Sequence, residues 1–259
     1  MSLSSIATYQ KYVKDGVKLE QKFEKSSDYK KEVDYFNKAV DKLKSVDEIF
    51  KDHRLVSFLA KALNLSGEEQ YPGKMKRILT EKVDDKNAVM NRLSSKQYKN
   101  AAEALRLGES GLDRLKLNGT KESLIYGYKN AKYEESIGQE NLAVRQARYF
   151  EKYAATASST PYTVLGDPIL REVVTYTLGL PKQIAIQPVE TQARAITDRV
   201  DIKKFSDPKF RESFIKKFLN KHDMEDLGSG GSNSWMVSLF SPAGSGGSSG
   251  TGGGLNIVI

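Results

Sequence analysis

The chain has 259 residues, of which 39% are hydrophobic and 29% charged, and its formal net charge is +8 at neutral pH. This composition is typical of a helical protein with enough apolar material for a core, as one large domain or two small ones. Cysteine is absent, which excludes disulfides and thiolate metal sites. No apolar run approaches the roughly 18 residues of a membrane-spanning helix, and the N-terminus resembles no secretory signal. We therefore expect a cytoplasmic protein.

The positive charge is concentrated in the N-terminal part of the chain. Residues 1–107 carry 22 basic and 16 acidic side chains. A nucleic-acid-binding face usually gathers Lys and Arg into a patch without acids. Here lysines alternate with acids, as in Lys38, Asp41, Lys42 and Lys44. This pattern favours a solvated helix surface over a phosphate-binding face.

Two amphipathic helices are predicted in the first 44 residues. The first, over residues 3–24, has an apolar side made of Ile6, Tyr9, Val13 and Val17. The second, over residues 28–44, has a narrow apolar stripe that favours packing against a neighbouring helix of the same chain. The stripe consists of Tyr29, Val33, Phe36, Val40 and Leu43. We treat residues 1–27 as an N-terminal helical segment and residues 28–227 as one helical body.

A helical unit occurs twice in this body, at about residues 46–107 and 162–220. Three blocks match in the same order, with offsets of 115, 117 and 112 residues. The first pairs Asp52, Leu55 and Ala-Leu-Asn-Leu at 62–65 with Asp167, Leu170 and Thr-Leu-Gly-Leu at 177–180; the second pairs Leu-Thr-Glu-Lys-Val-Asp at 79–84 with Ile-Thr-Asp-Arg-Val-Asp at 196–201; the third pairs Ser94, Tyr98 and Lys99 with Ser206, Phe210 and Arg211. Such repetition predicts architecture rather than chemistry.

Within the two units, apolar periodicity predicts a set of shorter helices. They lie near residues 46–64, 71–83, 84–93 and 95–107 in the first unit, and near 167–179, 188–200 and 207–220 in the second.

The ends of these helices carry residues typical of caps. Ser45 and Glu48 have the spacing of a capping box at the start of the first unit. Asn64 and Gly179 follow apolar runs at matching places, and both residue types accept the left-handed backbone of a helix C-cap. Asp84 and Asp201 suit the N-cap of the next helix, so we interpret the repeated acidic blocks as structural rather than as a site.

Between the two units we predict one long helix, over residues 120–155. Its broad apolar face makes it a scaffold against which both units pack. Gly127 and Gly138 interrupt it, and each is a candidate for a kink or for a close helix crossing.

The composition changes sharply after residue 227. Residues 228–259 contain 10 Gly and 8 Ser, a composition that buries too little apolar surface to offset chain entropy, so we expect a disordered tail. Two apolar islands interrupt it and are candidates for docking onto a protein partner. Their candidate docking residues are Trp235, Met236, Leu239, Phe240, Leu255, Ile257 and Ile259. The alternative is that each island folds back onto the chain's own helices or has no role.

No catalytic or cofactor-binding motif occurs in the sequence. His53 and His222 are far apart and have no metal-site spacing around them. Neither a Gly-x-Ser-x-Gly elbow nor a phosphate-binding loop is present. We therefore expect a non-enzymatic protein without catalytic residues, metal ligands or cofactors.

Four blocks resemble a bacterial family known as domain of unknown function 1217. They are Val-Asp-Glu-Ile-Phe-Lys-Asp-His-Arg-Leu at 46–55 running on to 62–65, Gly138 to Glu151, Leu165 to Leu170 with 178–181, and Phe-Ser-Asp-Pro at 205–208. The similarity covers about residues 28–220. Members of that family occur mainly in alphaproteobacteria and are often encoded among flagellar genes, and some carry a basal-body rod protein label.

The resemblance implies a helical, non-enzymatic protein of flagellar context and supplies no catalytic or ligand-binding residues. Axial flagellar proteins usually pair N- and C-terminal helical heptads, whereas this C-terminal end is Gly-rich, which favours an accessory, chaperone or assembly role. We therefore expect a protein that binds other proteins, including flagellar components. One alternative is nucleic-acid binding by residues 1–107. Another is peripheral membrane attachment by the first helix and the apolar tail residues. The oligomeric state stays open.

Overall fold

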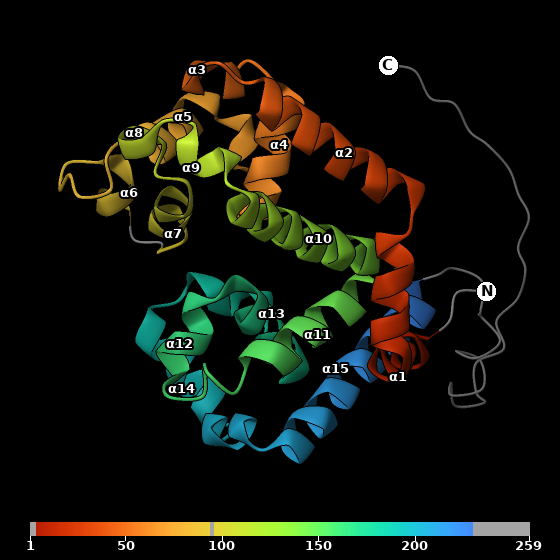
Figure 1. Ribbon diagram of the computed structural model, residues 1–259. Helices are drawn as coiled ribbons and strands as arrows, with labels where there is room; N and C mark the ends of the chain where they lie inside the picture. Colours follow the sequence, from red (N-terminus) through yellow and green to blue (C-terminus); the bar gives the residue numbers. More distant parts are fainter. Residues whose placement is uncertain (1–3, 94–95, 230–259) are drawn as a thin grey trace, which may run out of the picture.

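The computed structural model describes residues 4–93 and 96–229, and this part of the chain contains helices and turns but no strand (Figure 1). The predicted all-α fold is therefore confirmed for these residues. Most of the predicted Gly/Ser-rich tail, from residue 230 onward, lies outside the described residues.

The described helices form two lobes, each with its own apolar core (Figure 1). The first lobe contains α2 (Ser27–Lys42), α3 (Val46–Ile49), α4 (His53–Ala62), η1 (Glu68–Gln70), α5 (Pro72–Thr80), α6 (Val89–Arg92), α7 (Lys96–Leu105), α8 (Leu107–Ser110) and α9 (Asp113–Lys116). The second lobe contains α1 (Ser5–Glu24), α11 (Leu142–Tyr153), α12 (Pro161–Gly166), α13 (Pro168–Thr177), η2 (Lys182–Ile186), α14 (Val189–Thr197), η3 (Ile202–Ser206) and α15 (Pro208–Ser229). One helix, α10 (Asn118–Glu140), contributes to both cores.

An aromatic stack joins three helices in the core of the first lobe. The ring of Phe58 on α4 lies 4.2 Å from that of Phe36 on α2 and 3.9 Å from that of Tyr128 on α10. Phe36 belongs to the apolar stripe that the sequence predicts, and it is fully buried together with Val40. Burying an aromatic side chain of this size contributes about 1.5–3 kcal/mol, and stacked rings add to that.

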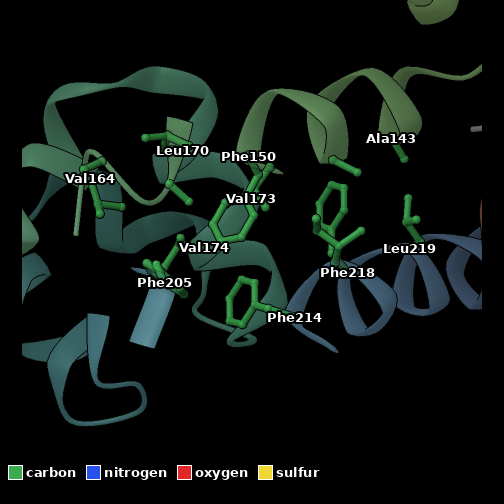
Figure 2. Packing of buried hydrophobic residues seen from close by; sticks show 14 of the residues in the cluster. Ala143, Phe150, Val164, Leu170, Val173, Val174, Phe205, Phe214, Phe218 and Leu219 are labelled. Atoms are coloured by element: carbon green, nitrogen blue, oxygen red, sulfur yellow. The ribbon is translucent and has the colours of Figure 1, made fainter. Parts of the chain in front are cut away.

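Phenylalanine side chains also lie at the centre of the core of the second lobe (Figure 2). Phe150 on α11 contacts Phe205 and Phe214, with ring centroids 5.1 and 5.2 Å away. Val173 and Val174 of α13 are fully buried in the same core. The side chains in this view come from α11, α12, α13, η3 and α15, so residues far apart in sequence close one core.

Helix α10 crosses α4 at very short distance. A Cβ atom on Gly127 would lie 2.3 Å from the carbonyl oxygen of Ala62, so only glycine permits this approach. Leu124 and Tyr128 of α10 are buried in the first core, and Tyr133 and Ile137 in the second. The predicted close crossing at Gly127 is confirmed, and α10 serves as the shared scaffold.

The structure contradicts the prediction of one continuous helix over residues 120–155. Asn141 has an extended backbone (φ −159°, ψ 113°) and separates α10 from α11. Its side chain accepts a hydrogen bond from the amide of Val144, so it is the N-cap of α11. The break lies three residues after Gly138, and it places α11 in the second lobe.

The first two repeat blocks occupy equivalent helices in the two lobes. Asp52 and Asp167 are the N-caps of α4 and α13, and the carboxylate of each accepts a hydrogen bond from a tyrosine hydroxyl, Tyr35 on α2 and Tyr149 on α11. The residues that follow α4 and α13 also match. After each of these two helices the chain reverses through a residue with a left-handed backbone, Asn64 (φ 58°) after α4 and Gly179 (φ 67°) after α13.

The reversal after each of these helices is a Schellman motif. The amide of Leu65 donates to the carbonyl of Ala60 at 2.7 Å, and the amide of Leu180 donates to the carbonyl of Thr175 at 2.9 Å. The predicted C-caps are confirmed. The third repeat block differs, because α7 packs against α5 and α6 whereas α15 packs against α11 and α13.

Two predicted caps are wrong. The side chain of Ser45 makes no capping hydrogen bond, and the carboxylate of Glu48 accepts instead from the amide of Lys44 at 2.9 Å. Asp201 caps η3 through the amide of Lys203, but Asp84 caps no helix, since α6 begins five residues later with Ala88 as its N-cap. The helix predicted over residues 46–64 is also divided, because Asp52 starts α4 anew.

The apolar side predicted for the first helix is only partly buried. Tyr9 is buried, but Val13 and Val17 are 57% and 71% exposed. The face of α1 that packs against α11 and α15 consists of Ser5, Thr8, Tyr9 and Tyr12. The predicted N-terminal segment is therefore part of the second lobe. The buried face of α1 includes Ser5 and Tyr12, whose side chains form hydrogen bonds with Asn141 and Glu140.

Candidate functional site

The two histidines of the chain occupy unrelated positions. His53 is exposed in the first turn of α4. The ring of His222 on α15 packs against the rings of Tyr176 and Phe218 at 4.4 and 4.9 Å. Across residues 4–93 and 96–229, no group of three or more His, Asp or Glu side chains is arranged to hold a metal ion.

Polar side chains from distant parts of the chain meet where α1 crosses the break between α10 and α11. Glu140 accepts hydrogen bonds from the hydroxyl of Tyr12 at 2.5 Å and from Lys11 Nζ at 2.9 Å. The side-chain amide of Asn141 donates to Ser5 Oγ at 3.0 Å, and the Ser5 amide donates to Asp223 Oδ1 at 2.8 Å. These groups hold α1, α10, α11 and α15 together.

The electrostatics of this junction follow from its hydrogen bonds. The hydroxyl of Tyr12 and the ammonium of Lys11 lower the pKa of Glu140, because both stabilise the carboxylate. Burial and the hydrogen bond to Glu140 raise the pKa of Tyr12. A carboxylate and a phenol that bind each other in this way stabilise the junction, and the arrangement suits positioning of helices rather than proton transfer to a substrate.

Several cations of the basic N-terminal part are paired with carboxylates. Arg54 lies 2.8 Å from Glu32, and Lys76 lies 2.7 Å from Asp47. In a partly buried pair, Lys74 lies 2.8 Å from Glu68, whose carboxylate also accepts from the hydroxyl of Tyr98 at 2.6 Å. The remaining positive charge is spread among acids on helix surfaces, as the alternating sequence pattern indicates.

Large apolar side chains are exposed on the outer faces of ordered helices. Val13 and Val17 lie one turn apart on α1. Ile186 is 83% exposed at the end of η2, and Val189 is half-exposed at the start of α14. Such side chains are candidates for contacts with other proteins.

A groove opens beside the C-terminal end of α14. Its lining comes from the start of α12 and from the C-terminal end of α14 with the residues that follow. The lining residues are Ser159, Pro161, Thr197, Val200, Asp201, Ile202 and Lys203. In the first lobe the corresponding surface after α5 is covered by α8, where the carboxylate of Glu109 accepts from the amide of Val83 at 2.7 Å. The duplicated sequence therefore produces one covered surface and one open groove.

A second depression lies in the first lobe, between α2 and the N-cap of α4. It is lined by Tyr35, Lys38, Leu43, Glu48 and Asp52, among others. Asp52 is already engaged there, since it caps α4 and accepts from Tyr35. The depression therefore offers mainly the exposed lysines of α2 to solvent.

The docking residues predicted from the sequence, Trp235 to Ile259, all lie outside the described residues. None of the described helices is long and apolar enough to cross a membrane. The open groove was missed because its walls come from segments about 40 residues apart. The repeat offset of 117 residues was the available signal, since it aligns Val83 with Val200.

Comparisons with known proteins place this architecture in a family. Residues 62–210 match the family described as "Protein of unknown function (DUF1217)". The crystal structure of protein AGR_C_984 from Agrobacterium tumefaciens is similar, with 26% sequence identity and a TM-score of 0.64. The match covers 87% of this chain and 98% of the Agrobacterium chain. No curated protein matches the sequence. Because the family model spans more than half of its length, this chain belongs to the DUF1217 family.

Proposed function

We propose that this protein is non-enzymatic and acts by binding other proteins during flagellar assembly or at the basal body. The observation that carries the proposal is the open groove beside α14. The walls of this groove are held in place by the well-packed core of the second lobe. Exposed aliphatic side chains at Ile186 and Val189, at the other end of α14, add apolar area on the same lobe. The groove is lined by polar as well as apolar side chains. A fixed surface of this kind suits protein recognition, because little conformational entropy is lost on binding.

The flagellar context is supported by the family resemblance, whose members are often encoded among flagellar genes. We place the protein in the cytoplasm, as its composition predicts, with association to the flagellum during assembly. Within the described residues, the polar clusters are used to pair helices, and this supports a scaffold role for the helical body.

Deletion of the gene followed by a swimming assay and electron microscopy of basal bodies tests this function. We expect reduced swimming that is restored by the full-length gene. Normal swimming together with normal basal bodies in the deletion strain would refute the flagellar role.

Affinity capture from the native cell tests the binding function itself. Full-length protein and a version that ends at Leu227 provide a matched pair. Partners captured by both versions bind the helical body, and a partner lost with the shorter version binds the predicted docking residues of the tail. Capture of no flagellar component by either version would contradict the proposal.

Nucleic-acid binding by residues 1–107 is the alternative function, favoured by their excess of basic side chains. It predicts binding to DNA or RNA that weakens steeply as salt concentration rises, because phosphate contacts release counterions. Absence of binding at low salt would exclude this alternative.

A further inference from the structure

The two lobes meet at the joint between α10 and α11. Asn141, with its extended backbone, is the only residue between these two helices. Helix α10 reaches from this joint into the first lobe, whereas α11 belongs to the second (Figure 1). Hinges in proteins are formed by a few residues at the ends of helices or strands that absorb changes in φ and ψ. A change in these angles at Asn141 would therefore turn one lobe against the other.

The direct contacts between α10 and α11 lie close to this joint. A side-chain nitrogen of Arg148 donates to the carboxylate of Glu134 at 3.1 Å, and each of these residues is seven positions from Asn141. Gly138 and Arg145 lie against each other closer still to the joint. Seven residues of helix correspond to about 10 Å. Contacts with so short a lever arm restrain the angle between the lobes only weakly.

Helix α1 lies across the joint, and its first half is attached to the second lobe. Tyr9 is buried in the core of that lobe, and the Ser5 amide donates to Asp223 of α15 at 2.8 Å. The Ser5 hydroxyl also accepts from the side chain of Asn141 at 3.0 Å. This half of α1 therefore moves with the second lobe.

The second half of α1 is attached to α10 by Lys129. The ammonium of Lys129 lies 2.7 Å from the carboxylate of Glu20 and 3.0 Å from that of Glu24, and the side chain of Lys129 is only 12% exposed. Lys129 is twelve positions from Asn141, which corresponds to about 18 Å of helix. This contact therefore acts on a longer lever arm than the contacts between α10 and α11.

Aromatic rings continue the attachment of α1 into the first lobe. The ring of Phe23 lies 5.6 Å from that of Tyr133 on α10 and 5.4 Å from that of Tyr29 on α2. The ring of Tyr29 stacks in turn on that of Tyr128 at 6.5 Å, and Tyr128 belongs to the aromatic stack of the first lobe. The C-terminal end of α1 is therefore tied to α10 and α2 by both ionic and aromatic contacts.

We propose that α1 is a strap that fixes the angle between the two lobes, and that Lys129 is the contact that fastens it. One half of the strap belongs to the second lobe and the other half is held on α10 and α2, so the lobes do not turn about Asn141 while both halves are attached. Loss of the Lys129 ammonium leaves the carboxylates of Glu20 and Glu24 without the cation that they share, and the second half of α1 detaches. This inference concerns the shape of the helical body and goes beyond the proposed protein-binding function.

The distance between the far ends of the two lobes reports this angle. Because the chain has no cysteine, Asn100→Cys on α7 and Thr191→Cys on α14 create two unique sites for spin labels. Both positions are exposed, and Figure 1 shows α7 and α14 on the side of the lobes away from α1. Double electron–electron resonance on the full-length labelled protein should give one narrow distance distribution. A broad distribution would overturn the proposal, because the lobes would then turn with the strap in place.

A pair of matched substitutions on α10 tests the role of Lys129. Lys129→Gln should widen the distance distribution about twofold, because an unbraced hinge samples a range of angles. Lys132→Gln is the control, since the ion pair of Lys132 with Glu135 lies within α10 itself, and it should leave the distribution unchanged. A Lys129→Gln distribution as narrow as that of the unsubstituted protein, or equal widening by both variants, would refute Lys129 as the fastening contact.

Two further variants keep the test decisive if Lys129→Gln lowers the stability of the fold. Lys129→Arg keeps a cation for both carboxylates and should retain the narrow distribution. Glu24→Gln removes one of the two ion pairs at a partly exposed position and should widen the distribution. Circular dichroism checks that each variant keeps its helix content. A fully helical Glu24→Gln protein with a narrow distribution, or a Lys129→Arg protein with a wide one, would refute the strap. Swimming and partner capture test the proposed function separately, because none of these distance measurements involves a partner.

Discussion

Gly127 is the position where the contact between the shared helix α10 and the first lobe is most easily tested. Helix propensity alone predicts that Gly127→Ala stabilises the chain by about 1 kcal/mol. The structure predicts the opposite, because the new Cβ would lie 2.3 Å from the carbonyl oxygen of Ala62 and 3.2 Å from its carbonyl carbon. Both are backbone atoms of α4, so no side chain can rotate away to relieve the overlap.

The expected magnitude follows from these two opposing effects. Overpacking of a well-packed contact costs about 1–3 kcal/mol, and a rigid backbone contact belongs at the upper end of that range. After the gain in helix propensity is subtracted, we expect a net loss of about 1–2 kcal/mol. For a chain of this size, that loss lowers the melting temperature by about 2–8 °C.

Thermal unfolding followed by circular dichroism at the helical minimum provides the assay. Gly16→Ala is the matched control, since Gly16 lies within α1 and its Cβ would have no neighbour within 4 Å. This control should gain about 0.5–1 kcal/mol. A Gly127→Ala protein that is stabilised as much as the control would refute the close helix crossing.

Three further predictions concern the core, the chain reversals and the junction. Phe58→Ala should destabilise the first lobe by about 3–5 kcal/mol in urea unfolding, because it empties the middle of an aromatic stack. Gly179→Ala should lower the free energy of unfolding by about 1–2 kcal/mol, whereas Asn64→Gly should leave it unchanged, because both positions have a left-handed backbone that glycine adopts without strain. Equal effects of the two substitutions would contradict the matched C-caps. The lowered pKa of Glu140 means that its contribution to stability is present above its ordinary pKa of 4.5 and is lost as the pH falls through its folded value. Tyr12→Phe should raise the pKa of Glu140 and reduce the loss of stability at acid pH, measured by urea unfolding from about pH 7 to about pH 3. An unchanged dependence of stability on pH would refute the role of the Tyr12 hydroxyl in stabilising the Glu140 carboxylate.

Local features of this protein were set by residue types close together in sequence. Asp52 and Asp167 start helices because a carboxylate can accept from amides two or three residues later. Asn64 and Gly179 end helices because both residue types tolerate a left-handed backbone. These interactions involve only a few neighbouring residues, so the matched C-caps and the all-α fold were predicted from the sequence. The helix start at Asp52 was instead placed inside one helix over residues 46–64.

The tertiary structure decided everything that depends on which helices meet. Val13 and Val17 have the spacing of a buried face, yet α1 buries Thr8 and Tyr12 instead, because hydrogen bonds to α10 and α11 orient it. The repeat offset of 117 residues marks the surfaces after α5 and α14 as equivalent, but only the tertiary structure shows that α8 packs over the first of them, with Gly108 against Thr80. Burial is a property of the partner surface as well as of the residue, and that surface lies far away in the chain.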